Sequence, residues 1–125
     1  RAKYYIRYVD DFVILHKSKE QLELWRLFID NFLKNELGLT LHPEKTKIIS
    51  LSKGVDFVGF RNFYHHKLLR KRNLRNIEGK INKFKCKEIS NNKMGEIFQG
   101  WNAYAKWADT YELRKKIVKE FSNIK

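Results

Sequence analysis

Two adjacent aspartates, Asp10 and Asp11, are the residues of this chain best suited to chemistry. They interrupt two hydrophobic runs, residues 4–6 and 12–15, made of β-branched, aromatic and leucine side chains. Such residues favour strands, and aspartate favours turns, so this pattern predicts a β-hairpin with both acids at its turn. Two neighbouring carboxylates repel each other, and a divalent cation between them would relieve that repulsion. An ordinary solvated turn is the alternative, and the two residue types alone leave both interpretations open.

Histidine and cysteine invite a second metal hypothesis. His65 and His66 are adjacent, His16 and His42 stand apart from them, and Cys86 is the only thiol. No spacing among these residues matches a structural zinc site, so we reject zinc. Neither a serine nucleophile triad nor a glycine-rich phosphate loop is recognisable.

The charge of the chain points to a polyanionic partner. Lys and Arg number 27 against 14 Asp and Glu, which gives a formal net charge of +13. The stretch Lys67–Lys87 holds nine basic residues and one acid, Glu78, and so contributes +8 of that charge. One alternative is a solvated helix face, but so one-sided a charge favours contact with phosphates. The candidate phosphate contacts are Lys67, Arg70, Lys71, Arg72, Arg75, Lys80 and Lys83.

Four aromatic residues near the C-terminal end could stack on bases: Trp101, Tyr104, Trp107 and Tyr111. Base stacking is a common way to hold single strands. Trp101 and Tyr104 also share the apolar stripe of a predicted helix, which favours core packing for these two.

The length and composition bound the remaining possibilities. A chain of 125 residues with 42% hydrophobic content suits one domain or two small lobes that touch. No apolar run approaches the ~20 residues of a membrane span, so no membrane partner is expected. The single cysteine is ordinary for a reducing compartment, and we expect a cytoplasmic protein. Because the chain opens on Arg1 and enters a strand almost at once, we expect a piece of a longer protein.

The first part of the chain must position the aspartate turn. Ser18, followed by Gln21, predicts a capping box at a helix start, and Gly38 predicts its left-handed end. The apolar stripe of this helix consists of Leu22, Trp25, Ile29, Phe32 and Leu33. Beyond it we expect short strands at Leu39–His42 and Lys47–Leu51, then a strand pair over Val55–Tyr64.

From Lys67 onward the sequence is typical of helices. Leu74, Ile77, Ile81 and Phe84 recur at helical spacing within the basic stretch. Asn91 and Asn92 are expected to break that helix. One helix then holds residues 94–105, and another begins near Thr110. The pattern predicts an α+β fold, with strands and one helix in residues 1–66 and an all-helical, basic lobe in residues 67–125.

In this order, the motifs resemble the C-terminal part of a reverse transcriptase, from the palm into the thumb. Tyr8–Asp11 matches the Y-x-D-D signature of that family. Leu39–Lys47 (LTLHPEKTK) resembles the lysine-bearing motif that follows, and Gly54–Phe60 (GVDFVGF) the strand pair called the primer grip. The basic helical end, with Arg70–Asn73 and Tyr111–Arg114, resembles the thumb of bacterial retroelement enzymes of the group II intron, retron and diversity-generating types.

The resemblance implies a two-metal nucleotidyl transfer in the complete enzyme. Asp10 would be the main Mg²⁺ ligand and Asp11 the secondary one. Members of this family carry a third carboxylate on an earlier strand, and fingers that hold template and nucleotide. Neither is recognisable in these 125 residues. We therefore expect this segment to be inactive alone and to bind Mg²⁺ weakly or not at all.

The same resemblance assigns roles to five further residues. Lys45 would stand near the triphosphate of the incoming dNTP, with Lys47 as the second choice. Tyr8 and Val9 would lie against the primer end, while Gly59 and Phe60 would position its backbone. A surface lysine and packed strand residues are the respective alternatives.

Three hypotheses follow for the function. The leading one is a fragment of an RNA-directed DNA polymerase that holds an RNA template and a DNA primer and uses dNTPs. The second is a non-catalytic basic module that binds RNA or an RNA/DNA heteroduplex, with Asp10 and Asp11 serving only as a turn. The third is the palm of a polymerase that copies RNA into RNA.

Overall fold

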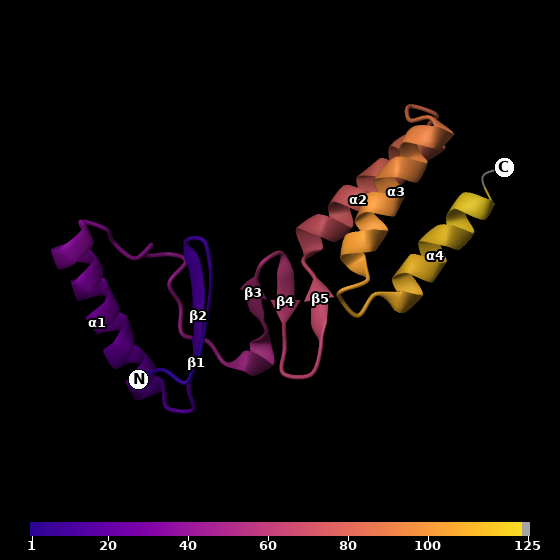
Figure 1. Cartoon of the computed structure of the whole chain (residues 1–125). Coiled ribbons are helices and arrows are strands. Elements are labelled where there is room, and N and C mark those ends of the chain that lie inside the picture. Colours follow the sequence, from indigo (N-terminus) through magenta and orange to yellow (C-terminus); the bar gives the residue numbers. More distant parts are fainter. Residues whose placement is uncertain (124–125) are drawn as a thin grey trace. The chain divides into compact units, whose positions relative to one another are not determined.

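The chain folds into four helices and two small antiparallel sheets, as the computed structural model shows for residues 1–123 (Figure 1). This confirms the predicted α+β class. The chain divides into two compact units, residues 1–50 and residues 51 onward. Within residues 1–123, no helix is both long and apolar enough to cross a lipid bilayer.

The first unit consists of a hairpin and one long helix. Strands β1 (Tyr4–Tyr8) and β2 (Asp11–Leu15) pair in antiparallel fashion, and helix α1 spans Lys19–Leu37. His16, just after β2, packs edge-on against Trp25 of α1 with ring centroids 5.1 Å apart. None of residues 1–50 is fully buried. This unit therefore has a thin core, and Leu24, Leu27 and Phe28 of α1 stay exposed.

Both predicted ends of α1 are confirmed. The hydroxyl of Ser18 accepts a hydrogen bond from the backbone N–H of Gln21 at 3.0 Å, which satisfies a donor that the first turn leaves free. The N–H of Ser18 donates to Nδ1 of His16 at 3.1 Å, a role that the Gln21 side chain would fill in a full capping box. Gly38 ends the helix with a φ of 63°.

The strands predicted at Leu39–His42 and Lys47–Leu51 are wrong. Residues 39–50 form neither strand nor helix, and Leu51–Lys53 is a short 3₁₀ turn, η1. Local hydrogen bonds hold this loop instead: the N–H of Thr46 donates to the carbonyl of His42 at 2.9 Å. A strand needs a partner along its edge, and short apolar runs cannot show from sequence whether one exists.

The second unit combines a three-stranded sheet with three helices. Its strands are β3 (Val55–Phe57), β4 (Phe60–Asn62) and β5 (Lys67–Leu69), in that order across the sheet. The predicted strand pair over Val55–Tyr64 is thus confirmed. Strand β5 was not predicted, and it pairs with β4 in antiparallel fashion. The sheet therefore continues across residues 66 and 67, where we placed the boundary between palm and thumb; that boundary stays a prediction.

Helices α2 (Lys71–Lys85), α3 (Asn91–Ala105) and α4 (Tyr111–Ser122) enclose the core of this unit (Figure 1). Its buried side chains come from all three helices: Ile77, Ile81, Met94 and Ile117. The apolar period predicted for α2 is confirmed, because Ile77 and Ile81 are buried and Phe84 packs against them.

The helix break predicted at Asn91 and Asn92 is wrong. Lys87 ends α2 with a φ of 60°, its N–H donating to Phe84 and that of Glu88 to Lys83, both at 2.9 Å. This pair of bonds is the usual C-terminal motif with a left-handed residue, normally glycine. Asn91 instead starts α3, whose cap is the hydroxyl of Ser90.

Candidate active site and nucleic-acid interface

The aspartate turn is a two-residue loop. Tyr8 pairs with Asp11 across the hairpin, which leaves Val9 and Asp10 as the central residues. Val9 has a φ of 53° and is 72% exposed. A β-branched residue is costly in this conformation, by roughly 1–3 kcal/mol, and such strain tends to cluster at functional sites. Both flanking strands have the predicted positions, so the hairpin presents Val9 and Asp10 at its tip.

The carboxylates of Asp10 and Asp11 are exposed and, within residues 1–123, neither has a hydrogen bond or an ion pair. Unpaired carboxylate oxygens are the hard ligands that Mg²⁺ accepts, so their chemistry fits this ion. No group of three Asp, Glu, His or Cys residues in the described part of the chain converges on one point. The pair thus supplies part of a magnesium ligand set.

Lys45 lies in the irregular loop after α1. It is exposed and makes no ion pair with any described residue. The loop is tied back to the helix by the N–H of Leu41, which donates to Asp30 at 3.4 Å. Lys34 hydrogen-bonds the same carboxylate at 2.6 Å and is the main cause that lowers the pKa of Asp30. The ammonium group of Lys45 is thus free for an anionic ligand.

Gly59 has a reason to be glycine that the sequence did not reveal. With Val58, it forms the tight turn between β3 and β4, and its φ is 81°. A Cβ atom here would collide with the hydroxyl of Tyr104 in α3. The ring of Tyr104 stacks on Phe60 at a centroid distance of 4.7 Å, and burial raises the pKa of its phenol. The close approach expected at Gly59 is thus made by Tyr104, while primer contact stays a prediction.

The basic face of α2 lies opposite its buried face. The exposed cations Lys71, Arg72, Arg75, Lys80 and Lys83 form this face. Within residues 1–123 none of them has an ion pair, unlike Lys85, which bonds Glu120 of α4 at 3.1 Å. At about 3.6 residues per turn, their positions fall on the side away from Ile77 and Ile81. Unpaired cations on one side make a surface suited to a phosphate backbone.

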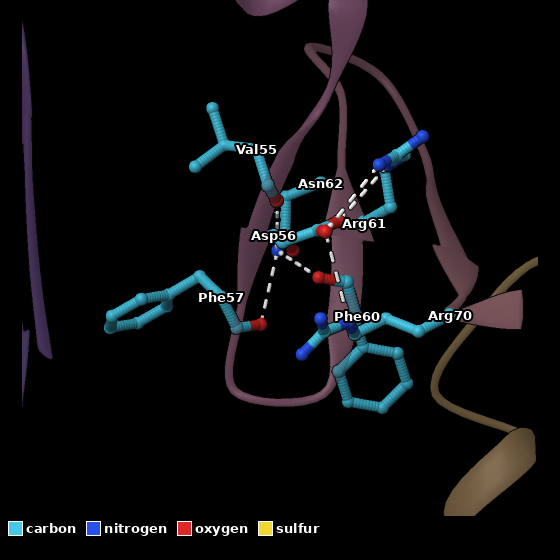
Figure 2. A network of polar contacts seen from close by, with 7 residues as sticks. All are labelled: Val55, Asp56, Phe57, Phe60, Arg61, Asn62 and Arg70. Carbon is cyan, nitrogen blue, oxygen red and sulfur yellow. Dashed lines mark hydrogen bonds and ion pairs between the residues drawn. The ribbon is translucent and has the colours of Figure 1, made fainter. Parts of the chain in front are cut away.

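Arg70 belongs to a different environment from the other candidate contacts. Figure 2 shows it beside the carboxylate of Asp56, which Arg61 holds across the β3–β4 pair. The distances to Asp56 are 3.0 Å from Nε of Arg61 and 3.7 Å from Nε of Arg70. The hydrogen bond from Arg61 lowers the pKa of Asp56. Arg70 is therefore partly neutralised, whereas Arg61 is a further exposed cation that the sequence analysis missed.

Asn62 is a second residue that the sequence analysis missed. Its side-chain amide lies within hydrogen-bond distance of the carbonyls of Val55, Phe57 and Phe60, at 3.2–3.3 Å (Figure 2). The amide thus ties the two strands of the hairpin to each other. The position of an asparagine near a tight turn gave no signal of this role, because the three carbonyls converge only in the folded hairpin.

The four aromatic candidates divide into two pairs. Trp101 packs against the core and donates its indole N–H to Asn73 of α2 at 2.8 Å, while Tyr104 packs on Phe60. Core packing is confirmed for both. Trp107 and Tyr111 are each 64% exposed.

Known proteins resemble mainly the first half of the chain. Residues 1–62 match the family model of the reverse transcriptases (RNA-dependent DNA polymerases). The match supports membership of the reverse transcriptase family. It includes β1, β2, α1 and the β3–β4 pair, and hence the unpaired carboxylates of Asp10 and Asp11.

One curated relative is protein YkfC of Escherichia coli strain K12. It is 41% identical over 69 residues, which cover 54% of this chain and 16% of the relative. The chain thus matches about a sixth of that protein's length. A reverse transcriptase-like polymerase segment is the coarse description that these comparisons support.

Proposed function

We propose that this chain is a palm and thumb segment of an RNA-directed DNA polymerase of bacterial retroelement type. In the complete enzyme it would extend a DNA primer on an RNA template with dNTPs. One observation carries the proposal: Asp10 and Asp11 lie unpaired at a strained two-residue turn, inside the region that matches the reverse transcriptases. An ordinary turn has no need for two adjacent acids and a β-branched residue with positive φ.

Asp10 and Asp11 would hold the divalent cations. Bound Mg²⁺ activates the primer hydroxyl and offsets the charge that develops on the leaving pyrophosphate. Water molecules, substrate phosphates and a carboxylate from another part of the polymerase would complete the ligand sets. In this proposal the segment alone does not polymerise.

Other residues of the chain would bind and orient substrate. Lys45, whose ammonium group is free of ion pairs, would neutralise the triphosphate or protonate the pyrophosphate. Tyr8 and Val9, both exposed, would contact the primer end. The β3–β4 turn with Gly59 and Phe60 would support the primer backbone, held in shape by Tyr104 from behind.

The basic face of α2 would hold the backbone of the template–primer duplex. Gly79 lies on this face, and nothing surrounds the position of its missing side chain. A phosphodiester backbone could therefore approach the helix closely there. Contacts of this kind are blind to sequence and weaken steeply as salt concentration rises. The same face would serve the second hypothesis, a basic module without catalysis.

The test separates catalysis from binding in the full-length protein that carries this segment. Asp10→Asn should abolish primer extension and leave duplex affinity unchanged, because it removes a metal ligand and not a phosphate contact. Reversing two charges on α2, with Lys80→Glu and Lys83→Glu, should weaken duplex binding and flatten its salt dependence by about one per lost contact. Lys93→Glu on α3, outside the basic face, is the matched control.

Each outcome assigns the chain to one hypothesis. Continued DNA synthesis by Asp10→Asn would refute the catalytic role of the hairpin and favour the binding module. If the α2 variant bound duplex as well as the Lys93 control, the thumb assignment would be wrong. Preference for ribonucleotides in the full-length enzyme would favour an RNA-copying polymerase that makes RNA.

A further inference from the structure

Trp107 is an exposed aromatic residue with lysines over its ring. It lies between α3 and α4 and is 64% exposed. Nζ of Lys67 and Nζ of Lys106 each lie 5.9 Å from its ring centroid. Lys67 also lies 5.0 Å from the ring of Phe60. Cations held near an aromatic ring interact with its electron-rich face, and they provide positive charge beside it.

The backbone around Trp107 is fixed in place. The N–H of Trp107 donates to the carbonyl of Tyr104 at 3.2 Å, and that of Asp109 donates to the carbonyl of Lys67 at 2.8 Å. The second bond joins β5 to the connection between α3 and α4. Thr110 is buried, and its hydroxyl donates to the carbonyl of Ala105 at 2.6 Å. An exposed ring on a well-anchored backbone loses little freedom when a ligand binds.

Tyr111 repeats the pattern one helical turn further on. It is the first residue of α4, is 64% exposed, and has Nζ of Lys115 at 5.9 Å from its ring centroid. Two acids belong to the same stretch, Asp109 and Glu112. The three lysines of this surface outnumber them, so its net charge is positive.

The combination fits single-stranded nucleic acid better than a protein partner. Aromatic side chains for the bases and cations for the backbone are the two components of sites that bind single strands. Protein–protein interfaces are also rich in Trp and Tyr, but they are depleted in Lys. Here each exposed ring has a lysine beside it.

We propose that Trp107 and Tyr111, with Lys67, Lys106 and Lys115, form a stacking platform for unpaired bases of single-stranded RNA or DNA. The platform is separate from the duplex-binding face proposed for α2, and it does not depend on catalysis by the aspartate hairpin. The four aromatic residues near the C-terminal end thus have two uses: Trp101 and Tyr104 build the core, and the other two contact a ligand.

The experiment measures binding of the whole chain to two labelled probes by fluorescence anisotropy. One probe is an oligouridine of about 12 nucleotides, long enough for a typical single-strand site, and the other is a blunt RNA/DNA duplex of the same length. Trp107→Ala should weaken oligouridine binding about tenfold and change duplex binding by less than about twofold. Trp107→Phe should keep most of the affinity, because it retains a ring.

Tyr64→Ala is the matched control. Tyr64 is 80% exposed in the same unit, and its ring contacts His65 and no lysine among the described residues. Its loss should leave both probes unaffected. Circular dichroism of each variant checks the fold, which an exposed ring should not disturb.

Two results would overturn the platform. The first is equal oligouridine affinity in the Trp107→Ala and Tyr64→Ala variants. The second is unchanged oligouridine affinity together with altered sedimentation of the Trp107→Ala variant, which would assign the surface to contact between protein chains. Neither result bears on primer extension by the Asp10→Asn variant, so failure here is distinguishable from failure of the polymerase proposal.

Discussion

The contact between Gly59 and Tyr104 makes the most direct test of how the sheet meets the helices. Replacing Gly59 with alanine should destabilise the second unit for two separate reasons. The φ of 81° costs an ordinary residue roughly 1–2 kcal/mol. The new Cβ would also collide with the Tyr104 hydroxyl, and overpacking of this kind costs roughly 1–3 kcal/mol. We therefore expect a loss of about 2–4 kcal/mol.

A double-mutant cycle divides this loss into its two parts. Tyr104→Phe removes the hydroxyl and keeps the ring, whose nearest carbon would be 3.4 Å from the new Cβ, an ordinary contact. The hydroxyl has no hydrogen bond in the described part of the chain, so this single change should cost little. The double variant should recover the collision part and retain the backbone part.

Urea unfolding, followed by circular dichroism at the helix signal, measures each free energy. The slope of the unfolding transition must stay the same among the variants for the comparison to hold. If Tyr104→Phe recovers none of the loss caused by Gly59→Ala, the two side chains do not compete for this space. The placement of the β3–β4 turn against α3 would then be wrong.

Two further predictions concern the second unit. Lys87→Gly should raise the urea midpoint by about 0.5–1 kcal/mol in unfolding free energy, because glycine adopts the left-handed φ of 60° without strain; a lower midpoint would contradict this end of α2. Asp56 has a lowered pKa in the folded protein, so its stabilising effect is present above its unfolded pKa of about 3.9 and is lost as pH falls through the folded pKa. Asp56→Asn should thus cost less than about 1 kcal/mol at pH 7, since the pair with Arg61 is exposed, and this deficit should vanish near pH 2; a constant deficit would exclude the ion pair as its cause.

Short-range signals in the sequence were reliable guides to several elements. The aspartate hairpin, the caps of α1 at Ser18 and Gly38, and the apolar period of α2 all follow from neighbours within about one helical turn. Their physical basis is local: backbone conformation, capping hydrogen bonds and the repeat of the helix decide them. The unpaired state of Asp10 and Asp11 also agrees with the metal hypothesis, although their role stays a prediction.

Elements that depend on distant partners were missed or misplaced. Strand β5 exists because β4 offers an edge to it, whereas residues 39–50 have no such partner and remain irregular. Lys87 occupies a position where glycine is usual, so the sequence carried no sign of the helix end there. The Asp56–Arg61 pair was open to prediction, because residues that flank a two-residue turn lie opposite each other.

The amino-acid sequence by itself determined the acidic turn, the basic face of α2 and the helices that carry them, because these follow from residue types and periodicity. Only the tertiary structure decided that Gly59 accommodates Tyr104, that Trp101 is bonded to Asn73, and that the ring of Trp107 stays exposed beside Lys67. The physical reason is the same in each case. These side chains lie far apart along the chain, and their contacts exist only after the sheet and the helices have packed.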